Sequence, residues 1–147
     1  MSQHPDLYDT DFYQWTQAQA AALRDGKLTA LDLVHLAEEI DSVGASEKRT
    51  IASQLLRLLA HLLKWGYEPS HRGPSWQDSI NDARVQIGLT IETSPSLHRY
   101  PAQSLARAYT RARRQAHRDT GLPLATFPDT CPWEVDQILA EDFWPEG

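Results

Sequence analysis

The chain has 147 residues, of which 41% are apolar and 23% are charged. This length and composition are typical of one globular domain with its own hydrophobic core and exclude a disordered chain. One cysteine excludes an internal disulfide and a cysteine-rich zinc site. The 14 basic residues are outnumbered by 20 acidic ones, and the net charge of -6 argues against nucleic acid as a partner of the whole molecule.

Neither a targeting signal nor a membrane span is expected. The first eleven residues contain three aspartates where a signal peptide needs basic and then apolar residues. The most apolar stretch, residues 55–63, is interrupted by Arg57 and His61 and is far shorter than the about 20 residues that cross a bilayer. We therefore expect a cytoplasmic protein with no membrane partner.

Capping residues, prolines and glycines predict where helices begin and end. Thr10 is expected to begin the first helix and Gly26 to end it, and Gly44 is expected to separate the second helix from the third. The expected helices cover residues 10–26, 29–44, 46–66, 75–93, 95–121 or 101–121, and 132–140. Two loops rich in proline or glycine, residues 67–74 and 122–131, complete the chain.

The spacing of apolar residues supports this helical interpretation. Within residues 46–66, one helical face carries Ile51, Leu55, Leu58, Leu59, Leu62 and Trp65. This wide apolar face predicts a central helix that packs against several partners. No segment shows the alternation of a strand. We predict an all-α fold, a compact bundle of five to six helices, as a single domain over residues 1–147 with loosely ordered ends at 1–9 and 143–147.

Several strings of residues occur together in a familiar order. They are Leu7-Tyr-Asp-Thr-Asp-Phe-Tyr-Gln-Trp-Thr, Leu36-Ala-Glu-Glu-Ile-Asp-Ser-Val-Gly, Leu59-Ala-His-Leu-Leu-Lys-Trp, Ser94-Pro-Ser-Leu, Thr120-Gly-Leu-Pro, Phe127-Pro, Cys131-Pro-Trp and Glu141-Asp-Phe-Trp-Pro. Together they resemble a bacterial family, abundant in cyanobacteria, that is known only as domain of unknown function 29. The resemblance spans almost the entire chain. It implies an all-helical cytoplasmic domain and supplies no activity or catalytic residue.

A candidate metal site involves His35, Glu38 and Glu39, which are spaced i, i+3 and i+4, with His61 as a candidate further ligand. Carboxylate-bridged metal sites in bundles need a Glu-x-x-His pair from each of two helices, whereas here the order is reversed and occurs once. We therefore predict no metal and no other cofactor. A small metal-binding protein or enzyme that uses His35, Glu38 and Glu39, with or without His61, is kept as an alternative.

The distribution of charge is uneven. Residues 96–118 contain six arginines and no acid, and four of them lie on one helical face: Arg107, Arg111, Arg114 and Arg118. We call these four the arginine stripe. It can be a solvated face, it can pair with acidic segments such as residues 136–142 of the same chain or of a second copy, or it can bind an anionic partner. We favour pairing with an acidic segment, because acids and bases occupy separate parts of the chain.

The loop between residues 65 and 76 gathers aromatic and polar side chains among glycines and prolines: Trp65, Tyr67, His71, Arg72 and Trp76. Such loops often line binding sites. The alternative is that the two tryptophans join two helices through the core while the other three side chains cover the connection.

The sequence contains no catalytic motif, so the biochemical activity stays unknown. We predict a non-enzymatic helical module that interacts with an unidentified protein partner or with itself. The alternatives are the metal-binding protein or enzyme described above and a binder of an anionic partner through Arg107–Arg118. Nucleic acid is not expected as the partner.

Overall fold

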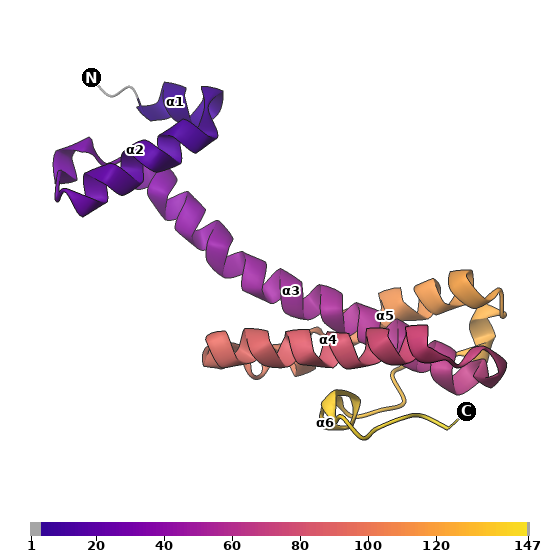
Figure 1. Cartoon of the computed structure of the whole chain (residues 1–147). Helices are drawn as coiled ribbons and strands as arrows, with labels where there is room; N and C mark the ends of the chain where they lie inside the picture. Colours follow the sequence, from indigo (N-terminus) through magenta and orange to yellow (C-terminus); the bar gives the residue numbers. More distant parts are fainter. Residues whose placement is uncertain (1–3, 147) are drawn as a thin grey trace. The chain divides into compact units, whose positions relative to one another are not determined.

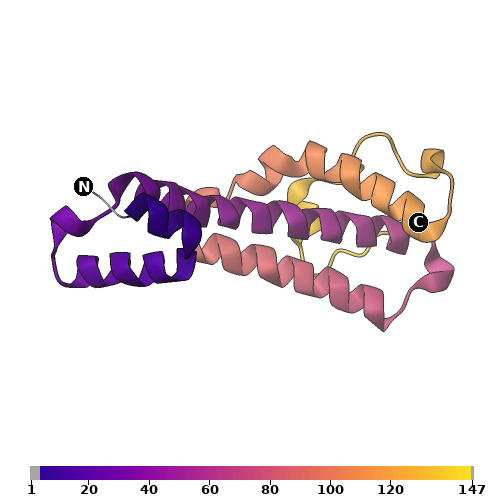
Figure 2. The same ribbon diagram turned by 90° about the horizontal axis from the view of Figure 1, so that it is seen from above.

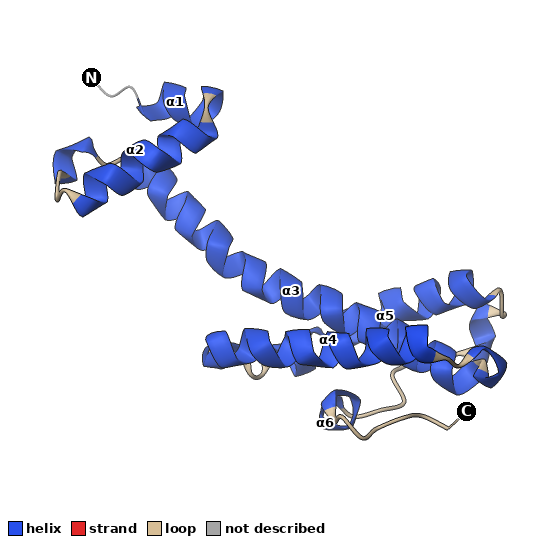
Figure 3. Cartoon of the chain, viewed as in Figure 1, coloured by secondary structure: helices blue, strands red, loops and turns tan. Residues whose placement is uncertain are grey.

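The structure is a computed structural model that describes residues 4–146 and the side chains of residues 7–146. All of the regular secondary structure in this part of the chain is helical (Figure 3). The helices are α1 (His4–Thr10), α2 (Phe12–Arg24), α3 (Leu33–Tyr67), α4 (Pro74–Thr93), α5 (Tyr100–Thr120) and α6 (Val135–Leu139). The prediction of an all-α fold with five to six helices is confirmed.

The chain forms two compact units, Met1–Ala45 and Ser46–Gly147, which we call the smaller and the larger unit. Helix α3 contributes its first residues to the smaller unit and the rest to the larger one. That the whole chain behaves as a single domain stays a prediction.

The smaller unit is organised around Trp15 of α2, which is 1% exposed. Asp11 begins α2, because its carboxylate accepts a hydrogen bond from the backbone N–H of Gln14, so the predicted start at Thr10 is shifted by one residue. Gly26 follows the helix with a φ of 69°, a left-handed conformation that glycine adopts without strain. Trp15 donates its indole N–H to Asp32 over 3.1 Å, which ties α2 to the start of α3.

The predicted break at Gly44 is wrong. Helix α3 continues through this residue without interruption, and its 35 residues replace the two helices expected at 29–44 and 46–66. Gly44 does not adopt a positive φ. One glycine inside a helix costs only about 1 kcal/mol, and no proline follows it to end the helix.

The second part of α3 is the centre of the larger unit and lies between α4 and α5 (Figure 2). Its residues Leu55, Leu58, Leu59 and Leu62 are fully buried, which confirms the predicted apolar face. Helix α4 adds Ile80, Ala83 and Ile87 to the same core, and α5 adds Ala108, Tyr109, Ala112 and Ala116. The small alanines of α5 allow its backbone to approach α3 closely.

Helix α6 and the residues after it pack across one face of these three helices (Figure 1). Ile138 of α6 is fully buried in the core, and Trp144 packs against Trp65 with ring centroids 4.8 Å apart. The helix begins at Val135 and not near Pro132, because Glu134 and Gln137 form a capping box. Over residues 4–146, no helix combines the length and hydropathy that a bilayer-spanning segment requires.

Candidate functional site

Two helices of the larger unit enclose a cavity of about 390 Å³ that is lined by positive charge. Lys48 and Arg49 reach it from α3, and Arg107 and Arg111 reach it from α5. Among the residues that the structure describes, no acid lines the cavity. We call this cavity the basic groove.

The remaining lining of the basic groove is apolar or carries hydroxyl groups. Ala52, Leu56 and Ala108 provide apolar surface, while Ser53, Ser104 and Tyr100 provide hydroxyl groups. Because arginine and lysine bind carboxylates and phosphates, and hydroxyl groups can donate to the same oxygens, this lining suits an anionic ligand with an apolar part.

Helical spacing explains why these cations meet. Arg107 and Arg111 are one turn apart on α5, and at about 100° per residue they lie on a different face from Leu105 and Tyr109, which face the segment at residues 129–131. The charged tips are all exposed, whereas Ala108 beside them is buried in the core. The core contact of α5 therefore fixes the direction in which the arginines project.

The positive charge of the basic groove is not neutralised within the described part of the chain. The ion pairs of the described residues are His35–Asp32, Arg57–Asp82, Lys64–Asp119, His71–Glu68 and Arg113–Asp129. None of these pairs includes a cation of the basic groove. Lys48 contacts the ring of Tyr100, with its Nζ atom 5.5 Å from the ring centroid. Four cations so close together repel one another, which favours binding of an anion.

Only part of the arginine stripe belongs to the basic groove. All four arginines are exposed, but Arg107 and Arg111 line the basic groove while Arg114 and Arg118 do not. Arg118 donates to the side-chain oxygen of Gln115 over 3.1 Å. Pairing with residues 136–142 of the same chain is not found among the described residues, because no stripe arginine forms an ion pair there.

The contribution of α3 to the basic groove was not predicted from the sequence. Lys48 and Arg49 follow one another in the sequence, and Ala52, Ser53 and Leu56 continue the same helical face. That pattern is readable in the sequence. What the sequence does not show is that this face of α3 lies beside Arg107 and Arg111.

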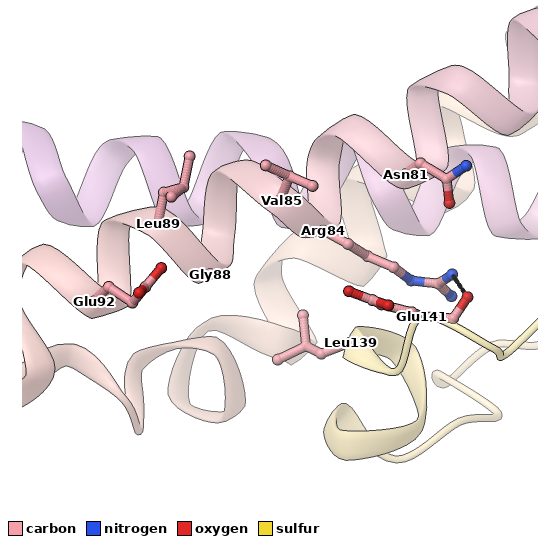
Figure 4. A pocket seen from close by; sticks show the side chains of 8 residues that line it. All are labelled: Asn81, Arg84, Val85, Gly88, Leu89, Glu92, Leu139 and Glu141. Carbon is pink, nitrogen blue, oxygen red and sulfur yellow. Dashed lines mark hydrogen bonds between the residues drawn. The ribbon is translucent and has the colours of Figure 1, made fainter.

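Arg84 of α4 has a different role, since it holds the segment around α6 in place (Figure 4). It donates to the backbone carbonyl oxygens of Ile138 at 2.9 Å, Glu141 at 3.3 Å and Phe143 at 2.7 Å. Its guanidinium also lies 5.6 Å from the ring centroid of Trp144. Burial lowers the pKa of Arg84, yet these carbonyl groups satisfy the donors of the charged form.

A second cavity, of about 620 Å³, lies beside Arg84. Figure 4 shows Val85, Leu89 and Glu92 on α4 together with Leu139 and Glu141 from the other side. Val85 and Leu89 are about half exposed, at 52% and 51%. The charged residues that line this cavity are Glu92, Glu141 and Arg84, and the guanidinium of Arg84 is already occupied by carbonyl groups.

The aromatic loop at residues 65–76 contacts the core and the last residues of the described chain. Arg72 donates to the carbonyl oxygens of Trp65 at 2.7 Å and Pro145 at 3.4 Å, and Tyr67 packs edge-on against Phe127. Its other two members, His71 and Trp76, have ring centroids 6.5 Å apart. None of these loop residues lines the basic groove or the cavity beside Arg84. A ligand-binding role for them stays a prediction.

The candidate metal ligands are engaged in other contacts. His35 stacks on Tyr8, with ring centroids 3.9 Å apart, and its Nδ1 lies 2.7 Å from Asp32. The hydrogen bond with Asp32 raises the pKa of His35. Tyr8 donates its hydroxyl to Glu39, and this bond raises the pKa of Tyr8 to about 12.

Two of the four candidate ligands lie outside this network. Glu38 is exposed, and His61 belongs to the larger unit, where its Nδ1 lies 2.8 Å from the carbonyl oxygen of Arg57 and burial lowers its pKa. Among the described residues, no three histidine, cysteine or acidic side chains gather as a metal ion would need.

Comparison with known proteins gives one match. The family model of domain of unknown function DUF29 matches residues 7–144, which is nearly the whole chain. No curated protein and no solved structure matches it. The matched range contains every residue of the basic groove.

Proposed function

This chain belongs to the family of domain of unknown function DUF29, and from that premise we propose that it is a non-enzymatic helical interaction module whose basic groove binds an acidic segment of a protein. The observation that carries the proposal is the convergence of four cations from α3 and α5 on one cavity, which no acid of the described residues lines. A bacterial, cytoplasmic setting is part of the same proposal.

The stability of the fold does not account for the four cations. Groove arginines that served the fold would be expected to pair with the chain's own acids, as Arg113 pairs with Asp129 over 3.0 Å. Arg107 and Arg111 form no such pair within residues 7–146. Exposed charges of one sign that are kept close together are typical of a binding surface for the opposite charge.

The size of the basic groove and the charge of the chain favour an acidic protein segment over nucleic acid. A cavity of about 390 Å³ accommodates a few side chains, and its apolar lining is suited to a peptide. A long nucleic acid would also meet the remaining surface, and the whole chain carries 20 acids against 14 bases. That excess of acid repels an extended polyanion but not a short segment inside the basic groove.

The proposal is tested with a fluorescently labelled peptide of six glutamates, whose binding to the full chain is followed by fluorescence anisotropy at low ionic strength. We expect binding that weakens as salt is added, because screening reduces the attraction. The double variant Arg107→Gln and Arg111→Gln should weaken binding by at least about tenfold, since charge-assisted hydrogen bonds are worth about 1.5–3 kcal/mol each.

The matched control is Arg114→Gln with Arg118→Gln, which removes the same charge from the same helix without touching the basic groove. It should bind the peptide within about threefold of the unaltered chain. Equal losses in both double variants would show that only bulk charge matters and would refute the groove as the site. Tighter binding of a single-stranded DNA of equal charge would replace the acidic protein segment by nucleic acid as the partner.

A further inference from the structure

We infer that the basic groove of one chain receives the acidic segment of a second copy of the same chain, with the acidic segment defined as residues 134–146. The inference rests on the proposed function, because it names the partner of the same groove. It follows from the charges of the larger unit, from the way Arg84 holds the acidic segment, and from the faces of α5.

Acidic residues are concentrated beyond α5. After Arg118 the chain has seven acids and no lysine, arginine or histidine. Asp119 and Asp129 pair with Lys64 and Arg113. The other five are exposed and take part in no ion pair of the described residues: Glu134, Asp136, Glu141, Asp142 and Glu146.

The acidic segment and the basic groove are complementary in charge. The segment carries five carboxylates and no cation, and the described lining of the groove carries four cations and no acid. The cations of the groove repel one another while they are unpaired, and the carboxylates of the segment are offset only in part, by the interaction of Arg84 with Glu141 and Asp142. Contact between the two removes both repulsions at once, which an uncharged partner could not do.

None of the described residues of the acidic segment lines the basic groove of its own chain, and packing holds the segment in its place. Arg84 donates to the carbonyl oxygens of Ile138, Glu141 and Phe143, and Ile138 is fully buried in the core. Moving the segment would break these hydrogen bonds and expose apolar surface, so its backbone stays in place. Its five acidic residues are exposed, so another molecule can reach them.

The residues that connect α5 to the acidic segment also run along a face of α5 other than the one that carries the groove arginines. Asp129 and Cys131 lie beside Leu105 and Tyr109, while Arg107 projects from a face about 160° away from Leu105 around the helix. Tyr109 donates its hydroxyl to the carbonyl oxygen of Pro128 over 2.6 Å, which holds the connection there. The cations are therefore matched by acids of another copy and not by those of their own chain.

The inference is tested by sedimentation of the full chain at low ionic strength, with two variants that each remove one side of the contact. The groove variant is Arg107→Gln with Arg111→Gln, and the segment variant is Asp136→Asn, Glu141→Gln and Asp142→Asn. The substitutions of the segment variant remove charge and keep the size of each side chain. Those of the groove variant remove charge and shorten the side chain, as the substitutions of the Arg114→Gln with Arg118→Gln control also do. We expect the unaltered chain to self-associate and each variant to weaken self-association by at least about tenfold.

A mixture of the two variants gives the decisive result. The segment variant keeps an intact basic groove and the groove variant keeps an intact acidic segment, so the two should form a one-to-one heterodimer that does not grow further. A fluorescent label on one variant distinguishes this heterodimer from self-association. Each variant is first checked by its far-ultraviolet circular dichroism and melting temperature. Arg114→Gln with Arg118→Gln, the matched control, should associate like the unaltered chain.

The possible outcomes separate the inference from the proposed function. A chain that binds the glutamate peptide but stays monomeric at low ionic strength overturns the second copy as the partner and leaves the proposed function standing. Self-association that both variants retain, or a mixture that forms no heterodimer, also overturns the inference. A chain that neither binds the peptide nor self-associates overturns both.

Discussion

The larger unit uses arginine in two opposite ways. Arg84 is 6% exposed and directs its donors at three backbone carbonyl groups of the segment around α6. Arg107 and Arg111 are exposed, line a cavity and form no ion pair among the described residues. The same side chain therefore stabilises the fold where its own chain satisfies its donors, and is free to present a binding surface where it does not.

Arg113 shows that the difference arises within a single helix. It lies on α5 between Arg111 and Arg114, yet it donates to the carbonyl oxygens of Phe127 and Leu124, both at 3.1 Å, and to Asp129 at 3.0 Å. Its neighbours in sequence project to another face of the helix. The face on which an arginine lies therefore decides its role.

The largest expected effect is the loss of stability when Arg84 is removed. Arg84→Ala leaves the carbonyl groups of Ile138 and Phe143 without their donor, and the free energy of unfolding should fall by about 3 kcal/mol. Urea unfolding followed by circular dichroism measures this change. Arg84→Lys, which keeps the charge but not the three-way geometry, should show a smaller loss. A loss below about 1 kcal/mol for the alanine variant would contradict the structural role of Arg84.

A smaller effect is expected from the buried cation that pairs with a carboxylate. Lys64 is 7% exposed and donates to Asp119 over 3.0 Å. Burial by itself raises the pKa of Asp119, but hydrogen bonds from Lys64 and Gln115 outweigh it and hold this pKa below its ordinary value of 3.8. The stabilisation is therefore present above pH 3.8 and is lost as the pH falls through the lower pKa of the folded state.

The variant Asp119→Asn tests this pH dependence. It should lower the free energy of unfolding at neutral pH by no more than about 1 kcal/mol, because the carboxylate is partly solvated. It should also flatten the loss of stability that the unaltered chain shows below about pH 4. Urea unfolding at several pH values provides the measurement. An unaltered slope in acid would mean that the Lys64–Asp119 pair does not contribute.

The smallest effect on stability is expected from the groove arginines. Arg107→Gln with Arg111→Gln removes two like charges one turn apart, so the free energy of unfolding should stay constant or rise by up to about 0.5 kcal/mol. Urea unfolding at low salt measures this change, in a solution dilute enough that the chains do not associate. A loss above about 1 kcal/mol would mean that the fold uses these side chains and would remove the contrast with Arg84.

Much of the fold could be predicted because local signals and packing agree. The apolar spacing of Leu55, Leu58, Leu59 and Leu62 indicated the central helix, and Gly121 ends α5 as predicted, with a φ of 73°. Gly44 misled the prediction, because a glycine signals a helix end only when it adopts a left-handed conformation. The short α6 begins later than predicted, because the capping box at Glu134, and not the preceding Pro132, determines its start.

Only the part of the candidate site that α5 contributes could be predicted from the sequence. The spacing of Arg107 and Arg111 placed both on one exposed face, and this holds in the structure. Lys48 and Arg49, which complete the basic groove, were not identified because they lie more than fifty residues away along the chain. Periodicity describes the faces of a single helix and carries no information on which faces of two helices lie side by side.

The sequence by itself determined the helical class, the central apolar helix and the separation of acidic from basic residues. Only the tertiary structure decided that Arg84 holds the segment around α6 while Arg107 and Arg111 stay unpaired beside Lys48 and Arg49. The physical reason is that helix formation and amphipathic patterning depend on residues within a few turns. Whether a charge is neutralised depends instead on which distant groups the packed core brings within hydrogen-bonding distance.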